Sequence, residues 1–96
     1  MADFCITAVR YNDTREHITR VHVREEKRGI IGPYRVVSRA FVADLIRLGK
    51  ATFITRTKNA EGKWIKGADV HTLEDIYLTT QRNNTKRDNL GRLPEF

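Results

Sequence analysis

The pattern of side chains at the start of the chain predicts a β-hairpin. Two sets of residues alternate from Phe4 to Tyr11, in a segment rich in β-branched and aromatic types that is typical of a strand. After turn residues 12–14, two valines alternate with basic residues between His17 and Glu25, so the second strand has one basic face. Ile18 is out of phase with these valines, which predicts a bulge or an exposed apolar residue near the turn.

One later segment has the periodicity of a helix. Ser38 is suited to be its N-cap, and the apolar residues that follow fall within one broad arc of a helical wheel. These residues are Phe41, Val42, Leu45, Ile46 and Leu48. Gly49 then fits a left-handed C-terminal cap, so we predict a helix over residues 38–48 with Arg39, Ala43 and Arg47 on its solvent face.

The remaining segments predict further strands on either side of this helix. A short strand is indicated within residues 30–37, and another over residues 51–57 is followed by a hairpin loop at residues 59–62. Its partner runs from residue 63 to about residue 73, with a bulge or bend at Gly67, and residues 76–80 form the last strand. The order ββ(β)αβββ predicts an α+β fold with one helix packed on a mostly antiparallel twisted sheet.

The length of the chain predicts one domain. Its 96 residues leave no room for a second core, so we expect a single α+β domain over residues 1–96, with residues 82–96 as a polar, partly extended tail. Apolar residues recur every three positions in this tail, at Leu90, Leu93 and Phe96. The tail therefore either docks on its own domain, which we favour, or presents a peptide to a partner.

The N-terminal sequence and the cysteine content predict a cytoplasmic protein. No run approaches the roughly 20 apolar residues that cross a bilayer, and Asp3 stands where a signal peptide would carry basic residues. We therefore expect no membrane partner. Cys5 is the single cysteine and lies in an apolar strand, so we expect a buried small side chain and not a nucleophile.

No pattern of reactive residues predicts catalysis. Gly29 and Gly32 do not have the spacing of a phosphate-binding loop, and His17, His22 and His71 lack the spacing of metal ligands. No nucleophile is paired with a base and an orienting group. We therefore expect a protein without enzymatic activity, catalytic residues, metal site or small-molecule cofactor.

The excess of basic residues indicates an anionic partner. The chain has 18 basic and 12 acidic residues, a net charge of +6 and a pI near 9.9, which favours nucleic acid or an acidic protein surface. The residues that we expect to form this surface are Arg10, Arg20, Arg24, Lys27, Arg28, Arg35, Arg39, Arg47 and Trp64. The alternative is a solvated face whose arginines pair with Glu16, Glu25 and Glu26.

Aromatic residues beside this charge are candidate stacking platforms for single strands. They are Tyr34, Trp64 and Tyr77. We expect Trp64, which is flanked by lysines, to be the most exposed of the three, and Tyr77 to belong to the core.

Several segments together resemble one small protein family. They are the opening from Cys5 to Asn12, the Ser-initiated helix ending in Gly49-Lys50, Gly62-Lys63-Trp64 with Gly67-Ala68, Tyr77-Leu78, and the ending from Asp88 to Phe96. Over nearly its whole length the chain is similar to a bacterial and phage family catalogued only as a domain of unknown function, family 3892. The resemblance implies a bacterial or phage origin and a stand-alone domain, but no activity and no site residues. The segment from Glu25 to Val37 is more basic than expected of that family, which leaves open a specialised role.

Two functional hypotheses follow from these observations. The first is nucleic-acid binding through the arginine-rich hairpin. The second is a protein-interaction module, such as a phage or mobile-element inhibitor of a host nucleic-acid-handling or defence complex. The sequence does not determine the oligomeric state.

Overall fold

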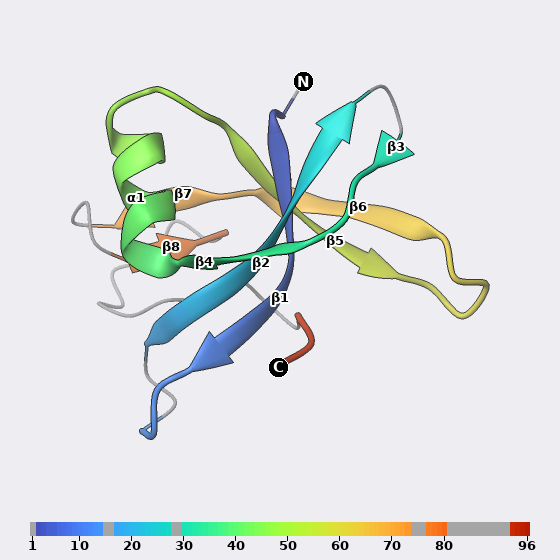
Figure 1. Ribbon diagram of the computed structural model, residues 1–96, viewed down its shortest axis with the longest axis horizontal. Coiled ribbons are helices and arrows are strands. Elements are labelled where there is room, and N and C mark those ends of the chain that lie inside the picture. The colour runs from blue at the N-terminus through green and yellow to red at the C-terminus, as the bar shows by residue number, and fades with distance from the viewer. Residues whose placement is uncertain (1, 15–16, 28–29, 74–76, 81–92) are drawn as a thin grey trace.

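The computed structural model has one helix and a curled sheet, and it describes residues 2–14, 17–27, 30–73, 77–80 and 93–96 (Figure 1). The elements in chain order are β1 (Phe4–Tyr11), β2 (Ile18–Lys27), β3 (Ile30–Ile31), β4 (Arg35–Ser38), α1 (Arg39–Arg47), β5 (Phe53–Lys58), β6 (Trp64–Asp69), β7 (His71–Leu73) and β8 (Tyr77–Thr79). The main sheet has the order β3-β2-β1-β5-β6, and β4 also pairs with β2. Among the strand pairs in the described residues, only β1 and β5 are parallel, which confirms the predicted α+β class.

The predicted β1–β2 hairpin forms, and it contains two register shifts. Arg10 is opposite Arg20 while Tyr11 is opposite Ile18, so Thr19 is an extra residue in β2. This bulge turns Ile18 into the core, where it is 1% exposed, and it confirms the irregularity predicted from the phase of that residue. A second shift between Ile6 and Ala8 lies on β1.

The helix is capped as its sequence predicts. The Phe41 amide donates a hydrogen bond of 3.2 Å to the Ser38 hydroxyl. At the other end, Gly49 has φ of 68°, and the Lys50 amide donates to the Leu45 carbonyl at 2.9 Å. The backbone conformation of Gly49 is one that residues with a Cβ rarely adopt. Both ends of α1 are therefore determined by local sequence.

The predicted orientation of the helix is wrong at three positions. Ala43 is 2% exposed and belongs to the core, whereas Phe41 and Leu48 are 54% and 57% exposed. The reason is that α1 contacts β2 and β4 of the main sheet and also the separate β7–β8 pair. Because α1 packs against both the main sheet and the β7–β8 pair, its buried face includes Ala43.

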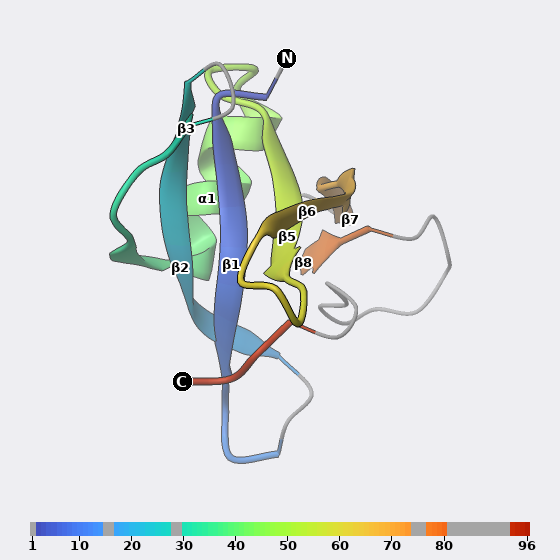
Figure 2. The ribbon, with the colours of Figure 1, turned by 90° about the vertical axis from the view of Figure 1, so that its right-hand side faces the viewer.

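The core fills the space between α1 and one face of the main sheet. Ile6, Val21 and Val42 are fully buried there, together with Leu78 from β8. Figure 2 shows α1 behind the sheet, with the last residues of the chain crossing on the near side. Within the described residues, no helix lies on the opposite face of the sheet. No helix in the described part of the chain has the length and apolar character needed to cross a membrane.

The end of the chain docks on β1, as we favoured from its sequence. β5 pairs with β1 only from Phe4 to Ile6, which leaves the later part of that edge open. The Val9 amide donates to the Pro94 carbonyl at 2.9 Å, and the Phe96 amide donates to the Val9 carbonyl at 3.0 Å. Residues 93–96 therefore cover an edge that would otherwise expose unpaired backbone groups. The rest of the predicted tail lies outside the described residues.

Gly67 lies where the chain predicts a bulge, since Gly67 and Ala68 of β6 are both opposite the single residue Thr55 of β5. Replacing Gly67 with alanine is expected to lower the free energy of unfolding by about 1–2 kcal/mol. A Cβ here would lie 2.1 Å from the Thr55 hydroxyl oxygen and 3.1 Å from the Thr55 carbonyl oxygen. That hydroxyl also accepts a 3.0 Å hydrogen bond from the Ala68 amide, so rotating it away loses this bond. Urea unfolding measures the effect.

A double-mutant cycle provides the control for this prediction. In a Thr55→Ala background the hydroxyl is absent, so the added cost of Gly67→Ala should be smaller. An equal cost in both backgrounds would show that the contact with Thr55 is not its cause.

Candidate functional site

The alternation of β2 places its basic residues on the face opposite the helix. Val21 and Val23 are buried against α1, so Arg20, His22 and Arg24 point to the open face. Arg10 of β1 is the register partner of Arg20 and is also exposed. The basic face predicted from the sequence of the hairpin therefore exists.

Two aromatic rings stack on the His22 imidazole on this face. The centroid of the Phe96 ring lies 3.8 Å from that of the imidazole, with an interplanar angle of 27°. The Tyr34 ring lies 4.1 Å from the imidazole at 18°. Two rings this close and nearly parallel to one imidazole must cover its two faces. His22 is thus held between a residue just before β4 and the last residue of the sequence.

Cationic side chains continue this stack at both ends. The Arg24 guanidinium lies 5.4 Å from the Tyr34 ring and 5.0 Å from the Trp64 ring, and the Lys58 ammonium lies 4.9 Å from Trp64. At the other end, the Arg10 guanidinium lies 4.9 Å from the Phe96 ring. These distances fall within cation–π range.

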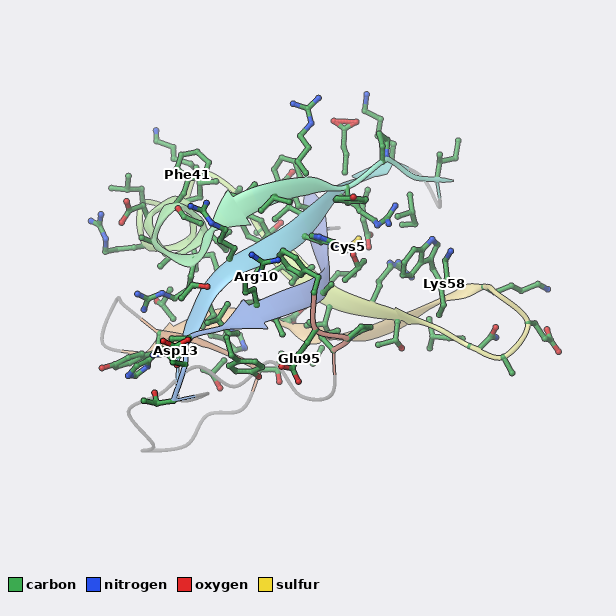
Figure 3. All side chains as sticks on the ribbon, turned by 60° about the horizontal axis from the view of Figure 1, so that its bottom comes forward. Cys5, Arg10, Asp13, Phe41, Lys58 and Glu95 are labelled. Carbon is green, nitrogen blue, oxygen red and sulfur yellow. The ribbon has the colours of Figure 1, made fainter. Side chains whose placement is uncertain are left out.

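We call this set the aromatic–cation row. It consists of Arg10, Phe96, His22, Tyr34, Arg24, Trp64 and Lys58. Figure 3 places Arg10 over the β1–β2 hairpin, Lys58 on the β5–β6 hairpin and Phe41 on the helix. The row therefore brings together β1, β2, β5, β6 and the C-terminal residues on one side of the sheet.

Arg24 is fixed at the centre of the row by two hydrogen bonds. Its Nε donates to the Thr7 hydroxyl at 3.2 Å, and its Nη1 donates to the Gly32 carbonyl at 3.1 Å. Thr7 is the extra residue at the register shift of β1, which orients its hydroxyl to the open face. Because the guanidinium is held in place, it loses little further rotamer freedom when it binds an anion.

An ion pair neutralises the acidic side chain of β2 on this face. Glu26 accepts hydrogen bonds from Arg56 of β5, and both side chains are largely buried. The buried Cys5 lies beside them, and its pKa is raised to about 11 by burial first and then by the Glu26 carboxylate. The hydrogen bond to Glu26 raises the pKa of Arg56. Since this carboxylate is bound to Arg56, it does not offset the charges of Arg20 and Arg24 on the same strand.

The pKa of His22 is lowered from its ordinary value of 6.5, first by burial and then by repulsion from Arg24 and Arg10. The folded protein therefore binds a proton at this site less readily than the unfolded chain. The stability that neutral His22 contributes is complete above about pH 6.5 and is lost as the pH falls below that value.

This pKa shift predicts that the stability of the wild type depends more strongly on pH than that of His22→Phe. Between about pH 7.5 and pH 5.5, the urea midpoint of the wild type should fall more than that of the variant, which keeps a ring but has no proton to gain. Equal falls in the two proteins would contradict the assigned pKa shift.

The eight described residues of the predicted partner surface lie on different faces. Arg10, Arg20, Arg24 and Trp64 are on the open face. Arg35 is opposite Val23 and lines the helix side, where Arg39 and Arg47 belong to α1. Arg47 pairs with Asp44 at 3.2 Å, and Lys27 pairs with Glu25 at 3.1 Å.

The described members of this predicted surface therefore do not gather on one face of the molecule. Neighbouring positions of a strand point to opposite faces, so closeness in sequence did not place the arginines together. Arg28 and Glu16 lie outside the described residues. Of the carboxylates in the alternative hypothesis, Glu26 does pair with an arginine, Arg56, which is outside the predicted surface, whereas Glu25 pairs with Lys27.

Sequence reasoning missed three members of the row. Lys58, Arg56 and Ile54 occupy alternate positions of β5, so the sequence predicts that their side chains lie on the same face of the sheet. His22 alternates in the same way with Arg20 and Arg24 on β2, so it is predicted to share their face. Phe96 has no such signal, because only the docking of the chain end brings it to His22. Of the three candidate platforms, Tyr34 is the most exposed, at 52%, whereas Trp64 is half-buried, so the expectation for Trp64 is wrong. Tyr77 stacks on His17 at 5.1 Å.

The helix side of the sheet carries a separate apolar groove. It has a volume of about 460 Å³ and lies between α1 and the β2–β4 edge. Phe41, Leu45 and Val37 line it, with Arg35 beside them. In the part of the chain that the structure describes, no three His, Cys, Asp or Glu side chains gather as metal ligands would.

The fold and the site define a small α+β domain whose open sheet face carries stacked rings and cations. The chain belongs to the family described as "Protein of unknown function (DUF3892)", which matches it over residues 5–94. This confirms the family resemblance drawn from the sequence. Comparison with curated proteins and with solved structures gave no match.

Proposed function

We propose that this protein binds single-stranded nucleic acid on the open face of its sheet. The observation that supports this function best is the aromatic–cation row. Single strands are commonly held on sheet faces by aromatic rings that stack on bases and by cations that contact the phosphates. The row offers both groups side by side.

The charges of the face favour a phosphate backbone. Arg10, Arg20, Arg24 and Lys58 have no ion pair with any described residue, and the nearby Glu26 is bound to Arg56. A planar guanidinium forms two parallel hydrogen bonds with a phosphate group. The net charge of +6 adds long-range attraction.

The rings favour an unpaired strand over a duplex. Bases in a duplex are stacked on one another, so a side chain reaches their faces only after they separate. Tyr34 and Trp64 both lie beside the anchored Arg24, so two rings and one cation are next to one another in the row. Binding of this kind depends little on base sequence because every base has an aromatic face.

Trp64 provides the test, since it is the single tryptophan of the sequence. Titrating the protein with an unlabelled thymidine oligonucleotide of about 12 residues at low salt should quench its fluorescence, because a base stacks on or beside the indole. A duplex of the same length should quench it less at equal concentration. Unchanged fluorescence, together with no binding of a labelled oligonucleotide by anisotropy, would refute the proposal.

The apolar groove beside α1 favours a second function, that of a protein-interaction module. Phe41 is 54% exposed at this groove, and the exposed Arg35 lies beside it. These neighbours suit a partner segment with an apolar side chain next to an acidic one, as on the acidic surface of a nucleic-acid-handling complex.

The two functions are distinguished by separate variants. A protein partner that survives nuclease treatment should be lost with Phe41→Ala or Arg35→Glu and retained with Trp64→Ala. The reverse pattern would assign the interaction to the open face. A partner retained by all three variants would refute the groove as the docking site.

A further inference from the structure

The last residues of the chain cover part of the site proposed above. We call residues 93–96 the C-terminal strap. Leu93 is 8% exposed and packs into the core, while the Phe96 ring lies on His22 at 3.8 Å. The strap therefore runs from the core to the middle of the open face.

The strap occupies the groups that a nucleotide would use at this position. The imidazole of His22 has one face on Tyr34 and the other on Phe96, so neither is available to a base. Arg10 donates from Nε to the Phe96 backbone oxygen at 3.0 Å, and its guanidinium lies over the Phe96 ring. An aromatic ring and an oxygen atom thus stand where a base and a phosphate oxygen would be expected.

The backbone hydrogen bonds of the strap are few compared with those of the core strands. Among the described residues, the backbone of the strap pairs with β1 only at Val9, through one hydrogen bond in each direction. Edge segments with so few backbone bonds open more readily than the global fold. Phe96 can therefore leave His22 while β1 and β2 remain paired.

We propose that the C-terminal strap competes with nucleic acid for His22 and Arg10. This inference rests on the proposed function. When a single strand binds, Phe96 leaves, a base stacks on His22 and a phosphate takes the place of the Phe96 backbone oxygen at Arg10. The strap lowers the apparent affinity, because only molecules with the strap open expose His22 and Arg10 to the nucleic acid.

Affinity measurements test the competition. A labelled thymidine oligonucleotide of about 12 residues should bind Phe96→Ala about 5-fold more tightly than wild type, as expected when one aromatic stack no longer opposes binding. Phe96→Tyr keeps the ring and should bind like wild type. Phe41→Ala removes an exposed ring from the helix side and should also leave the affinity unchanged. Equal or weaker binding by Phe96→Ala would overturn the inference, because Phe96 would then be neutral or part of the platform.

Hydrogen exchange distinguishes an error in the strap inference from an error in the proposed function. Saturation with the oligonucleotide should speed exchange of the Val9 and Phe96 amides, whose hydrogen bonds join the strap to β1. If the oligonucleotide binds while exchange at both amides is unchanged or slower, the strap inference is overturned and the proposed function is retained. If neither wild type nor Phe96→Ala binds the oligonucleotide, the proposed function fails and the strap inference fails with it. Binding by Phe96→Ala alone would support both.

Discussion

Raising the NaCl concentration from about 50 to about 200 mM should weaken single-strand binding about 50-fold. Four cations are placed to contact phosphates: the row members Arg10, Arg24 and Lys58, and Arg20, the register partner of Arg10. None of the four has an ion pair with a described residue. If each neutralises one phosphate, the slope of log K against log salt is about −2.8 for a single strand. Anisotropy titrations at four or five salt concentrations measure this slope.

The control for the salt dependence is a pair of variants with equal charge. Arg20→Ala removes a cation from the open face and should make the slope shallower by about 0.7. Arg47→Ala removes one from α1, where it is paired with Asp44, and should leave the slope unchanged. A slope near zero for the wild type, or equal effects of the two variants, would show that the open face is not the phosphate-binding surface.

Replacing Arg24 with alanine should weaken single-strand binding about 30- to 100-fold, or about 2–3 kcal/mol. Arg24 is the only member of the row that lies beside two aromatic rings, Tyr34 and Trp64, as a cation. Its loss removes a charged hydrogen-bond donor and the cation that contacts both rings. The loss in affinity is measured by anisotropy at fixed salt.

Two further variants separate the chemistry of Arg24 from its charge. Arg24→Lys keeps the charge but not the planar fork, so it should bind with an affinity between those of the wild type and the alanine variant. Arg47→Ala should bind nearly as well as wild type. Circular dichroism of each variant shows whether the fold is retained. If Arg24→Ala is folded and binds within about 2-fold of wild type, the row is not the binding surface.

Elements determined by local sequence were predicted well. Ser38 and Gly49 cap the helix through hydrogen bonds and backbone conformation that depend only on nearby residues. The bulges near Ile18 and Gly67 were visible as breaks in the alternation of their strands. These signals are contained in a few consecutive residues, and so the sequence alone reveals them.

Features that depend on distant contacts were predicted less well. Ala43 was assigned to the solvent, because a helical wheel contains no information about a second unit such as the β7–β8 pair. Arg35 was grouped with Arg20 and Arg24 because the three are close in sequence, yet it faces the helix side. The basic face of β2 was predicted, but the ring that covers His22 comes from the far end of the chain. Phe96 reaches His22 only because residues 93–96 dock on β1, a contact between distant parts of the chain.

The proposed binding surface is tested most directly by mapping amide chemical shifts as a single-stranded oligonucleotide is added to the ¹⁵N-labelled protein. We predict that the largest changes occur at residues of the aromatic–cation row and at Thr7 and Gly32, which hold Arg24. Residues of α1 that face away from the sheet should change little. Changes concentrated on α1 and the groove at Phe41, or no changes at low salt, would contradict the assignment of nucleic-acid binding to the open sheet face.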